Sequence, residues 1–403
     1  MTQLSNISIS QNLPSTRTTV IFTCFLLFFS ILFLQNYPSS NTFLSTASAL
    51  TSQLISYSNS VINPSSPNNT KTCDIFDGRW VYDDSYPIYA PGSCSYVENE
   101  FNCFRNSRPD FGYLKYRWQP YGCDLPRFDA KKMMEMLKGK TLVFVGDSLN
   151  RNMCQSLACF LKMFKPKSSR SGALYSYDFK DYNCSIKLII APFLVQHRYL
   201  SKKKERLRLD IMEPIISKYH DADFLIFNTG HWWNHNKSQN GENFFQEGDV
   251  VHSKMDVGLA YTKALKTWAN WVDNNVNKSK TQVVFRGFSN THFMGGDWNT
   301  GGICDGEKEP IKDEKFLTPY PWLMQTLETV ISEMKTPVSY LNITKLTDYR
   351  KDGHPSIYRR PGKPRRGIIQ DCSHWCLPGV PDSWNELMYV SLLQSLEGSN
   401  RTS

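Results

Sequence analysis

The sequence has few charged residues near its N-terminus, only one long apolar run and no CxxC pair. The last two of these features exclude or disfavour particular classes of protein. Between residues 1 and 70 the only charged residue is Arg17, and the chain has a single long apolar run, which excludes a protein with several membrane spans. No CxxC pair is present, which argues against a zinc site. The 403 residues are 40% hydrophobic and 13% aromatic. That composition can build a large core and excludes a disordered or collagen-like chain.

The apolar run from Thr18 to Leu34 predicts a membrane-spanning helix. It would be roughly 25 Å long, which is short for an average bilayer but suits the thinner membranes of the early secretory pathway. Arg17 on its N-terminal side places residues 1–17 in the cytosol by the positive-inside rule. The alternative is a signal peptide cleaved after Ala49, but that site lies too far beyond the run. We therefore expect an uncleaved signal-anchor at residues 18–34 and a single-pass type II membrane protein.

Residues 35–70 contain no charged residue and are rich in Ser, Thr, Asn and Pro, which predicts a flexible lumenal stalk. The N-x-Ser/Thr sequons that follow the apolar run, and that can be glycosylated only in the lumen, are at Asn68, Asn183, Asn236, Asn277, Asn342 and Asn400. Cys24 lies within the predicted span. The remaining cysteines are Cys73, Cys94, Cys103, Cys123, Cys154, Cys159, Cys184, Cys304, Cys372 and Cys376. An even set in an oxidising compartment indicates several disulfides.

Residues 71–130 are rich in Trp, Tyr, Pro and Cys but show little periodicity, which predicts a disulfide-stapled N-terminal region. Residues 131–398 alternate between apolar β-prone runs and segments with helical spacing. The expected strands are 141–145, 187–190, 224–227, 282–285 and 338–341, and the expected helices are 128–137, 152–164, 258–276, 321–334 and 382–396. This alternation predicts an α/β fold, a three-layer α/β/α sandwich around a mainly parallel sheet.

The first candidate catalytic segment is Gly146-Asp147-Ser148, which follows the strongest predicted strand and precedes a helix. Reactive groups collect at the carboxyl ends of the strands in such a sheet. A serine at this turn would project its hydroxyl into the crevice, with the N–H groups of the helix N-terminus behind it. Gly, Asp and Ser are equally usual in an ordinary turn and helix cap, so the tripeptide alone leaves both interpretations open.

The second candidate is Asp371-Cys372-Ser373-His374 near the C-terminus. Asp and His three residues apart can lie on the same side of one turn, so that the carboxylate holds Nδ1–H of His374 and leaves Nε2 facing a nucleophile. The alternative is a loop with two satisfied polar side chains. Cys372 and Cys376 favour the catalytic interpretation, because disulfides beside the pair would hold it rigid.

Two further segments follow predicted strands. Residues 228–233 contain an Asn side-chain amide and a Gly backbone N–H, which are typical oxyanion-hole donors. Residues 285–299 form a polar, Gly-rich stretch that is either a substrate-binding loop or only a long connection. Tryptophans here could stack on sugar rings, although burial in the core is the more common fate of Trp. The candidate substrate-binding residues are Trp232, Trp233, Arg286 and His292.

A GDS serine followed far downstream by a DxxH pair resembles the arrangement of GDSL/SGNH esterases. Longer stretches are similar to the plant trichome birefringence-like family: CDIFDGRW at 73–80, GDSLNRN at 146–152, APFLV at 191–195, NTGHWW at 228–233 and DCSHWCLPGVPDSWNE at 371–386. The similarity covers about residues 71–398. FFQEGDVV at 244–251 and LNITKLTDYRKDGHPSIYR at 341–359 suggest the subgroup around trichome birefringence itself.

The resemblance implies an SGNH-hydrolase-like catalytic domain at 131–398 in a Golgi membrane protein that O-acetylates cell-wall polysaccharides such as xylan, mannan, xyloglucan or pectin. It implies that Ser148 is the acyl-carrying nucleophile, His374 the base and Asp371 its orienting acid. Gly146 and Asp147 belong to the same signature, Asn228 resembles the oxyanion-hole Asn, and Gly230 is a candidate second donor. The resemblance also suggests the disulfides Cys73–Cys123, Cys94–Cys159, Cys103–Cys376 and Cys304–Cys372, and leaves Cys154 and Cys184 outside this framework.

One set of catalytic residues can run two reactions, because the acetyl-serine can be attacked by a sugar hydroxyl in a transferase or by water in an esterase. We expect no bound cofactor, but an acetyl donor is required, such as acetyl-CoA or an acetylated intermediate. The alternative from another class is a bridging protein that holds pectin and maintains its esterification. The net charge of +9 and the basic run 202–208 permit an acidic partner such as pectin, although such a run is more often a solvated surface. Nucleic acid is not expected in the lumen, whereas other Golgi acetylation proteins are candidate partners.

Overall fold

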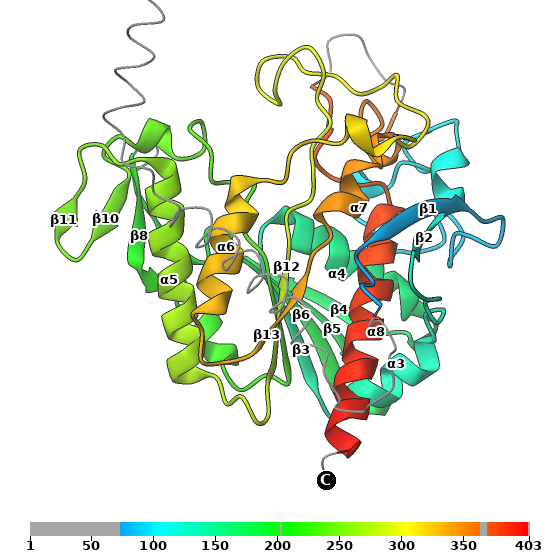
Figure 1. Ribbon diagram of the computed structural model, residues 1–403, viewed down its shortest axis with the longest axis horizontal. Coiled ribbons are helices and arrows are strands. Elements are labelled where there is room, and N and C mark those ends of the chain that lie inside the picture. Colours follow the sequence, from blue (N-terminus) through cyan, green and yellow to red (C-terminus); the bar gives the residue numbers. More distant parts are fainter. Residues whose placement is uncertain (1–72, 202–203, 363–368, 402–403) are drawn as a thin grey trace, which may run out of the picture. The chain divides into compact units, whose positions relative to one another are not determined.

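A seven-stranded sheet organises the computed structural model, which describes residues 73–201, 204–362 and 369–401 (Figure 1). The strands lie in the order β13 (Val338–Leu341), β12 (Gln282–Arg286), β9 (Phe224–Phe227), β3 (Thr141–Gly146), β6 (Cys184–Ile190), β5 (Leu174–Phe179) and β4 (Lys167–Ser171). The first five are parallel to one another, whereas β5 and β4 add an antiparallel edge. The expected mainly parallel sheet is therefore present.

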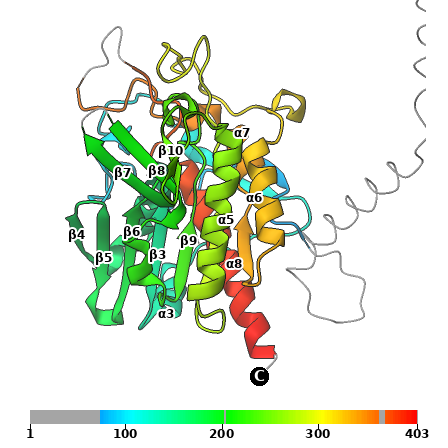
Figure 2. The same ribbon diagram turned by 90° about the vertical axis from the view of Figure 1, so that its left-hand side faces the viewer.

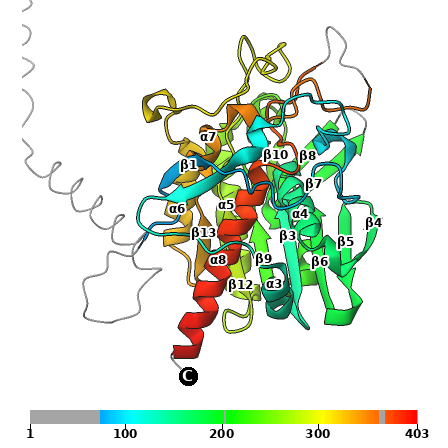
Figure 3. The ribbon, with the colours of Figure 1, turned by 90° about the vertical axis from the view of Figure 1, so that its right-hand side faces the viewer.

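Helices cover both faces of this sheet. Figure 2 shows α5 (Val257–Asn275) and α6 (Trp322–Ser332) on one face, and Figure 3 shows α3 (Ala130–Leu137), α4 (Ser148–Phe160) and α8 (Val380–Arg401) on the other. Alternate side chains of β3 belong to separate cores, Leu142 and Phe144 to one and Val143 and Val145 to the other. A strand buried on both faces reads as a continuous apolar run, which is why the sequence predicted it well.

The helices begin where side chains cap them. Asp147 caps α4 by accepting a hydrogen bond from the backbone N–H of Leu149, and Asp256 caps α5 in the same way through Leu259. Helix α4 therefore starts at Ser148, four residues before the beginning expected from apolar spacing alone. Caps are polar, so a search for apolar periodicity misses the first turn of a helix.

The N-terminal region contributes a two-stranded antiparallel sheet of β1 (Gly78–Tyr82) and β2 (Tyr116–Pro120), which lies beside α8 and α7 (Thr344–Asp348) in Figure 3. All four expected disulfides are present: Cys73–Cys123, Cys94–Cys159, Cys103–Cys376 and Cys304–Cys372. The Cys94 and Cys103 bridges join this region to the part of the chain that contains the central sheet. Cys154 and Cys184 are buried free thiols, and burial raises the pKa of Cys184 to about 11.

A second sheet was not expected from the sequence. Its strands lie in the order β11 (Val250–Val251), β10 (Phe245–Glu247), β8 (Lys204–Met212) and β7 (Val195–Ser201), and β8 packs against α5. The described part of the basic run therefore belongs to a strand rather than to an irregular surface segment. Arg206 is buried, and Arg208 pairs with Asp210 at 2.9 Å.

The predicted cytosolic tail, membrane span and stalk lie outside the described residues. Among the residues that the structure does describe, no helix has the length and apolar character needed to cross a bilayer.

Candidate active site

Ser148 lies at the first position of α4, directly beyond the carboxyl end of β3. The turn depends on Gly146, whose φ is +151° and whose place leaves no room for a side chain, because a Cβ there would lie 2.0 Å from Oδ1 of Asn228. Ser148 remains partly exposed, whereas Asp147 is fully buried. The local backbone thus holds the serine hydroxyl at an accessible helix N-terminus.

Ser148, His374 and Asp371 form one row of hydrogen bonds. Nε2 of His374 lies 2.7 Å from Oγ of Ser148, and Nδ1 lies 2.8 Å from Oδ2 of Asp371. Because an ionised carboxylate only accepts, Nδ1 carries the proton, and Nε2 of the neutral ring accepts from the serine hydroxyl. The other oxygen of Asp371 accepts the backbone N–H of His374 at 3.0 Å. Residues far apart in sequence are thus brought into the order of a nucleophile, a base and an orienting acid.

The electrostatics of this row stabilise the positive charge that His374 acquires when it takes a proton. Burial lowers the pKa of His374, but the charge and hydrogen bond of Asp371 more than offset this effect, so the net pKa is raised. Burial likewise raises the pKa of Asp371, and its contacts with His374 reverse that effect and leave it far below the usual value. Asp371 therefore stays ionised and stabilises the imidazolium that forms when His374 takes a proton.

Disulfides and packing hold the His374 loop. Cys372 is bonded to Cys304, Cys376 is bonded to Cys103, and the Phe101 ring lies 5.3 Å from the His374 ring. The prediction that both flanking cysteines form bridges to distant parts of the chain is confirmed.

Beneath Ser148, a buried cluster surrounds Asp147. Oδ1 of Asp147 accepts from the side-chain amide of Asn228 at 2.7 Å, and the backbone N–H of Asp147 donates to Oδ1 of Asn228 at 3.1 Å. Nδ1 of His231 lies 3.4 Å from the carboxylate and Nη2 of Arg286 lies 3.9 Å from it. Burial raises the pKa of Asp147, but the hydrogen bonds and charges of these partners lower it by more than burial raises it. The net pKa of Asp147 therefore lies far below its usual value. The cluster fixes Asn228 while leaving the second hydrogen of its amide free of Asp147.

The other predicted site residues have different surroundings. Gly230 is buried and its carbonyl accepts from the backbone N–H of Trp233 at 3.0 Å. Trp232 is partly exposed, whereas Trp233 is 3% exposed and donates to Oγ1 of Thr229 at 2.7 Å. The Arg286 side chain is 0% exposed. Trp233 and Arg286 therefore offer no surface to a polysaccharide, because they belong to the core and to the support of Asp147.

His292 also supports the site from inside rather than facing a substrate. Its Nδ1 lies 2.7 Å from Nε2 of His354, whose Nδ1 donates to the carbonyl of His374 at 2.7 Å. His354 stacks on Trp375 at 4.0 Å between ring centres. Burial, and secondarily the charge of His292, hold the pKa of His354 well below its usual value. Sequence reasoning missed His354, although its loop, GHPS at 353–356, lies within one of the stretches that suggest the family subgroup.

Comparison with known proteins agrees with this geometry. Residues 125–391 match the GDSL/SGNH-like acyl-esterase family found in Pmr5 and Cas1p, and residues 71–124 match the PMR5 N-terminal domain. The chain is 52% identical over 385 residues to protein trichome birefringence-like 4 of Arabidopsis thaliana, covering 89% of this chain and 84% of that protein. The chain belongs to the trichome birefringence-like family. Its catalytic part is thus a domain of the acyl-esterase class.

Two other family members differ in length. The chain is 53% identical over 347 residues to protein trichome birefringence-like 1 and 50% identical over 352 residues to protein trichome birefringence, both of Arabidopsis thaliana. The alignments cover 81% and 82% of this chain but only 62% and 58% of those proteins. This chain therefore spans less than two thirds of the length of these two relatives.

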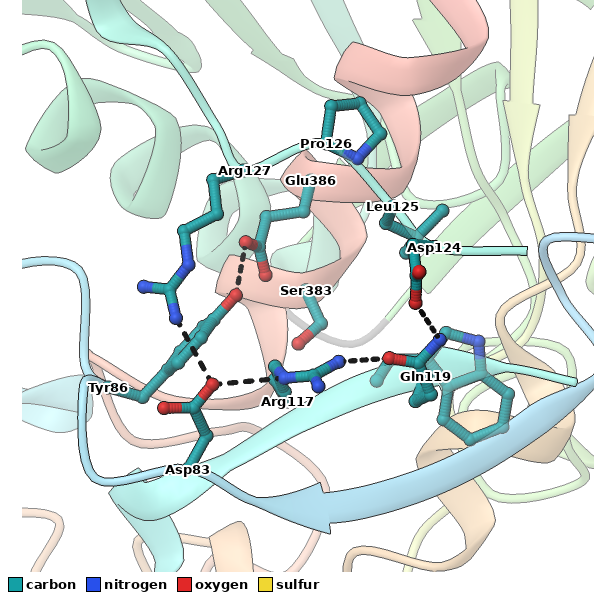
Figure 4. Close-up of a pocket in the computed structure, with 11 residues that line it drawn as sticks. Asp83, Tyr86, Arg117, Gln119, Asp124, Leu125, Pro126, Arg127, Ser383 and Glu386 are labelled. Atoms are coloured by element: carbon teal, nitrogen blue, oxygen red, sulfur yellow. Dashed lines mark hydrogen bonds and ion pairs between the residues drawn. The ribbon is translucent and has the colours of Figure 1, made fainter.

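A separate pocket of about 260 Å³ lies where the N-terminal region meets α8 (Figure 4). Its lining includes Asp83, Tyr86, Arg117, Arg127 and Glu386, and none of the three hydrogen-bonded catalytic candidates. The hydroxyl of Tyr86 donates to Glu386 at 2.6 Å, and both arginines pair with Asp83. Burial raises the pKa of Glu386 to about 7. The contact between the two parts of the chain thus includes a carboxyl that titrates near neutral pH.

We expect the protein to lose stability as pH rises from about 5 to about 8. Glu386 has a pKa of about 7 in the folded state against an ordinary value of 4.5, so the folded state holds its proton more tightly. The corresponding stabilisation, roughly 3 kcal/mol, is fully present below pH ~4.5 and is lost as pH rises through ~7. Glu386→Gln should flatten this dependence, measured as the melting temperature at pH 5 and pH 8. Glu135→Gln, on the exposed face of α3, is the control, and an equally steep profile in Glu386→Gln would contradict the assignment.

Proposed function

We propose that this protein is a polysaccharide O-acetyltransferase that works through an acetyl-serine on Ser148. The observation that carries the proposal is the row of hydrogen bonds from Ser148 through His374 to Asp371, at 2.7 and 2.8 Å. Membership of a family with an acyl-esterase domain supports acyl chemistry at this serine. The proposed acceptor is a hydroxyl of a cell-wall glycan such as xylan or pectin.

In the first half-reaction, Oγ of Ser148 attacks the carbonyl carbon of an acetyl donor and gives its proton to Nε2 of His374. The C–O bond of the new ester forms, the bond to the leaving group breaks, and His374 returns the proton to that group. Asp371 stabilises the positive charge on the imidazolium meanwhile. The donor is a substrate, such as acetyl-CoA or an acetylated intermediate.

The oxyanion of the tetrahedral intermediate needs donors close to Ser148. The second amide hydrogen of Asn228 is one candidate, because the first is used by Asp147. The backbone N–H of Ser148 is another, since the first turn of a helix has no intrahelical acceptor for its N–H groups. Donors held before the reaction stabilise developing charge without reorganising. The backbone N–H of Gly230, which lies on the same loop as Asn228, remains a third candidate.

In the second half-reaction, a sugar hydroxyl loses its proton to His374 and attacks the acetyl carbonyl. The bond from the carbonyl carbon to Oγ breaks, and the proton passes from His374 to Ser148. Water in place of the sugar would give an acetylesterase with the same residues. The proposed acceptor therefore distinguishes the two activities, whereas the proposed serine chemistry is common to both.

The direct experiment is to incubate the purified protein with an acetyl donor and deacetylated xylan, mannan and pectin oligomers, and to follow acetylation by mass spectrometry. Acetylated oligomers together with an acetyl group on Ser148 are the expected result. Release of acetate without acetylated oligomer would favour the esterase. Oligomer binding with no turnover would favour a bridging protein.

We also propose that the protein is a single-pass type II protein of the Golgi membrane with its catalytic domain in the lumen. The apolar run at 18–34 supports the anchor, and Asn183, Asn236 and Asn277 of three sequons are exposed. Endoglycosidase should therefore lower the apparent mass of protein made in a eukaryotic secretory pathway. An unchanged mass, together with a C-terminus that protease removes from intact vesicles, would contradict this topology.

A further inference from the structure

Lys237 places its ammonium group over two tryptophan rings. Its Nζ atom lies 4.9 Å from the centre of the Trp232 ring and 4.4 Å from the centre of the Trp298 ring, both within the range of cation–π attraction. Trp298 is 40% exposed. Glu242, the first acidic residue after Lys237 in the sequence, pairs instead with Lys254. In the ranges that the structure describes, no carboxylate lies within ion-pair distance of Lys237, so its charge is available to a ligand.

Trp232 is connected to the turn that carries Ser148 through its neighbour His231. Trp232 directly follows His231, whose Nδ1 lies 3.4 Å from the carboxylate of Asp147, the residue before Ser148. The Phe193 and Trp232 rings pack in a T-shaped arrangement, with 5.6 Å between ring centres. The indole therefore has a fixed orientation on the loop that follows β9.

Trp298 lies on a loop that is connected to the loop of His374, the predicted base. Trp298 belongs to residues 291–304, shown in yellow at the end of the fold opposite the C-terminus in Figure 1. At one end, the backbone N–H of His292 donates to the carbonyl of Cys372 at 3.0 Å. At the other, Cys304 is disulfide-bonded to Cys372. Lys237 thus joins two loops, one leading to Ser148 and the other to Asp371 and His374.

The chemistry of the three side chains favours a negatively charged sugar. Two indole rings exclude water from part of the Lys237 ammonium, which reduces screening and strengthens its attraction for an anion at the exposed side. A neutral sugar binds by stacking on an indole face. The Lys237 ammonium already occupies one face of the Trp232 ring and one face of the Trp298 ring. A uronate supplies a carboxylate for the ammonium and a ring that can contact the exposed part of Trp298.

We infer that Trp232, Lys237 and Trp298 form a subsite for a uronate unit of the polysaccharide acceptor. This inference rests on the proposed function, because it takes the acceptor to lie along the edge that carries Ser148. The ammonium of Lys237 binds the uronate carboxylate, and the indoles fix the position of the ammonium. Acidic polysaccharides are then bound in preference to neutral ones of the same length.

The test compares hexamers of galacturonic acid and of xylose binding to the full-length protein at low ionic strength, without an acetyl donor, by titration calorimetry. The galacturonate hexamer should bind at least about tenfold more tightly, which is the scale of one charge-assisted hydrogen bond. Lys237→Gln should weaken its binding about tenfold and change xylose binding less than twofold. Lys237→Arg should retain the preference, because guanidinium also lies well over aromatic rings.

Lys132→Gln on α3, an exposed lysine at the opposite end of the sheet, is the matched control and should bind both hexamers as the unmodified protein does. Equal binding of the two hexamers, or unchanged galacturonate binding by Lys237→Gln, would overturn the subsite. Acetylation of Ser148 is measured separately by mass spectrometry. If Ser148 is never acetylated but the dependence on Lys237 holds, the proposed function fails and the subsite stands.

Discussion

Replacement of Ser148 by alanine is expected to lower acetyl transfer by roughly 10⁴-fold or more, because the proposed acetyl intermediate forms on the hydroxyl that is removed. The fold should survive. The serine is partly exposed at the first position of α4, and the cap of this helix comes from Asp147. The measurements are the initial rate of oligomer acetylation and the melting temperature of the same preparation.

Ser169→Ala is the matched control for this experiment, because Ser169 is exposed on the edge strand β4 and should affect neither quantity. Unchanged turnover in Ser148→Ala would refute the covalent mechanism. A large drop in melting temperature in this variant would instead show that the hydroxyl has a structural role that the hydrogen bond to His374 does not reveal.

Removal of the Cys103–Cys376 disulfide, by serine at both positions, should lower turnover and stability together. A native disulfide stabilises a folded domain by about 2–5 kcal/mol. Cys376 lies two residues after His374, and a base displaced by about 1 Å can lose roughly a hundredfold in rate. We therefore expect a loss of about this size in kcat at a temperature where the variant remains folded, with a lower melting temperature.

The Cys73–Cys123 disulfide provides the control, because it closes a loop of the N-terminal region and contacts none of the catalytic candidates. Its removal should reduce stability with little change in kcat. If both double variants retain full turnover at low temperature, the Cys103–Cys376 bridge is structural only. Free thiols at these positions in the native protein would remove the basis of the experiment.

The strand ends of the central sheet were predictable from sequence because two separate signals coincide there. Thr141–Gly146 is a continuous apolar run, and glycine followed by two cap-forming residues marks its end. The pairing of Asp371 with His374 could be proposed for a similar reason, since the two residues have the spacing of one turn, whereas the pairing of His374 with Ser148 came from the resemblance to GDSL/SGNH esterases. These signals are local, so a single sequence displays them.

The predicted substrate-binding roles were wrong for residues whose side-chain exposure depends on the packing around them. Trp233 and Arg286 are near motif residues and were candidates for substrate binding, yet both are buried. His292 was a candidate for the same reason and instead contacts His354. Burial is decided by packing partners from elsewhere in the chain, such as Phe193, which packs against Trp233 from 40 positions away, so no local sequence pattern reveals it.

By itself, the sequence determined the alternation of strands and helices, the position of the serine turn and the motifs of the family. It did so because apolar periodicity, helix caps and turn residues act between near neighbours in the chain. Only the tertiary structure decided that His374 lies 2.7 Å from Ser148, that Asn228 is held by Asp147, and that Lys237 meets Trp298. Those contacts join segments up to 226 residues apart, and their geometry is set by the packing of both sheet faces and by the disulfides that hold the loops.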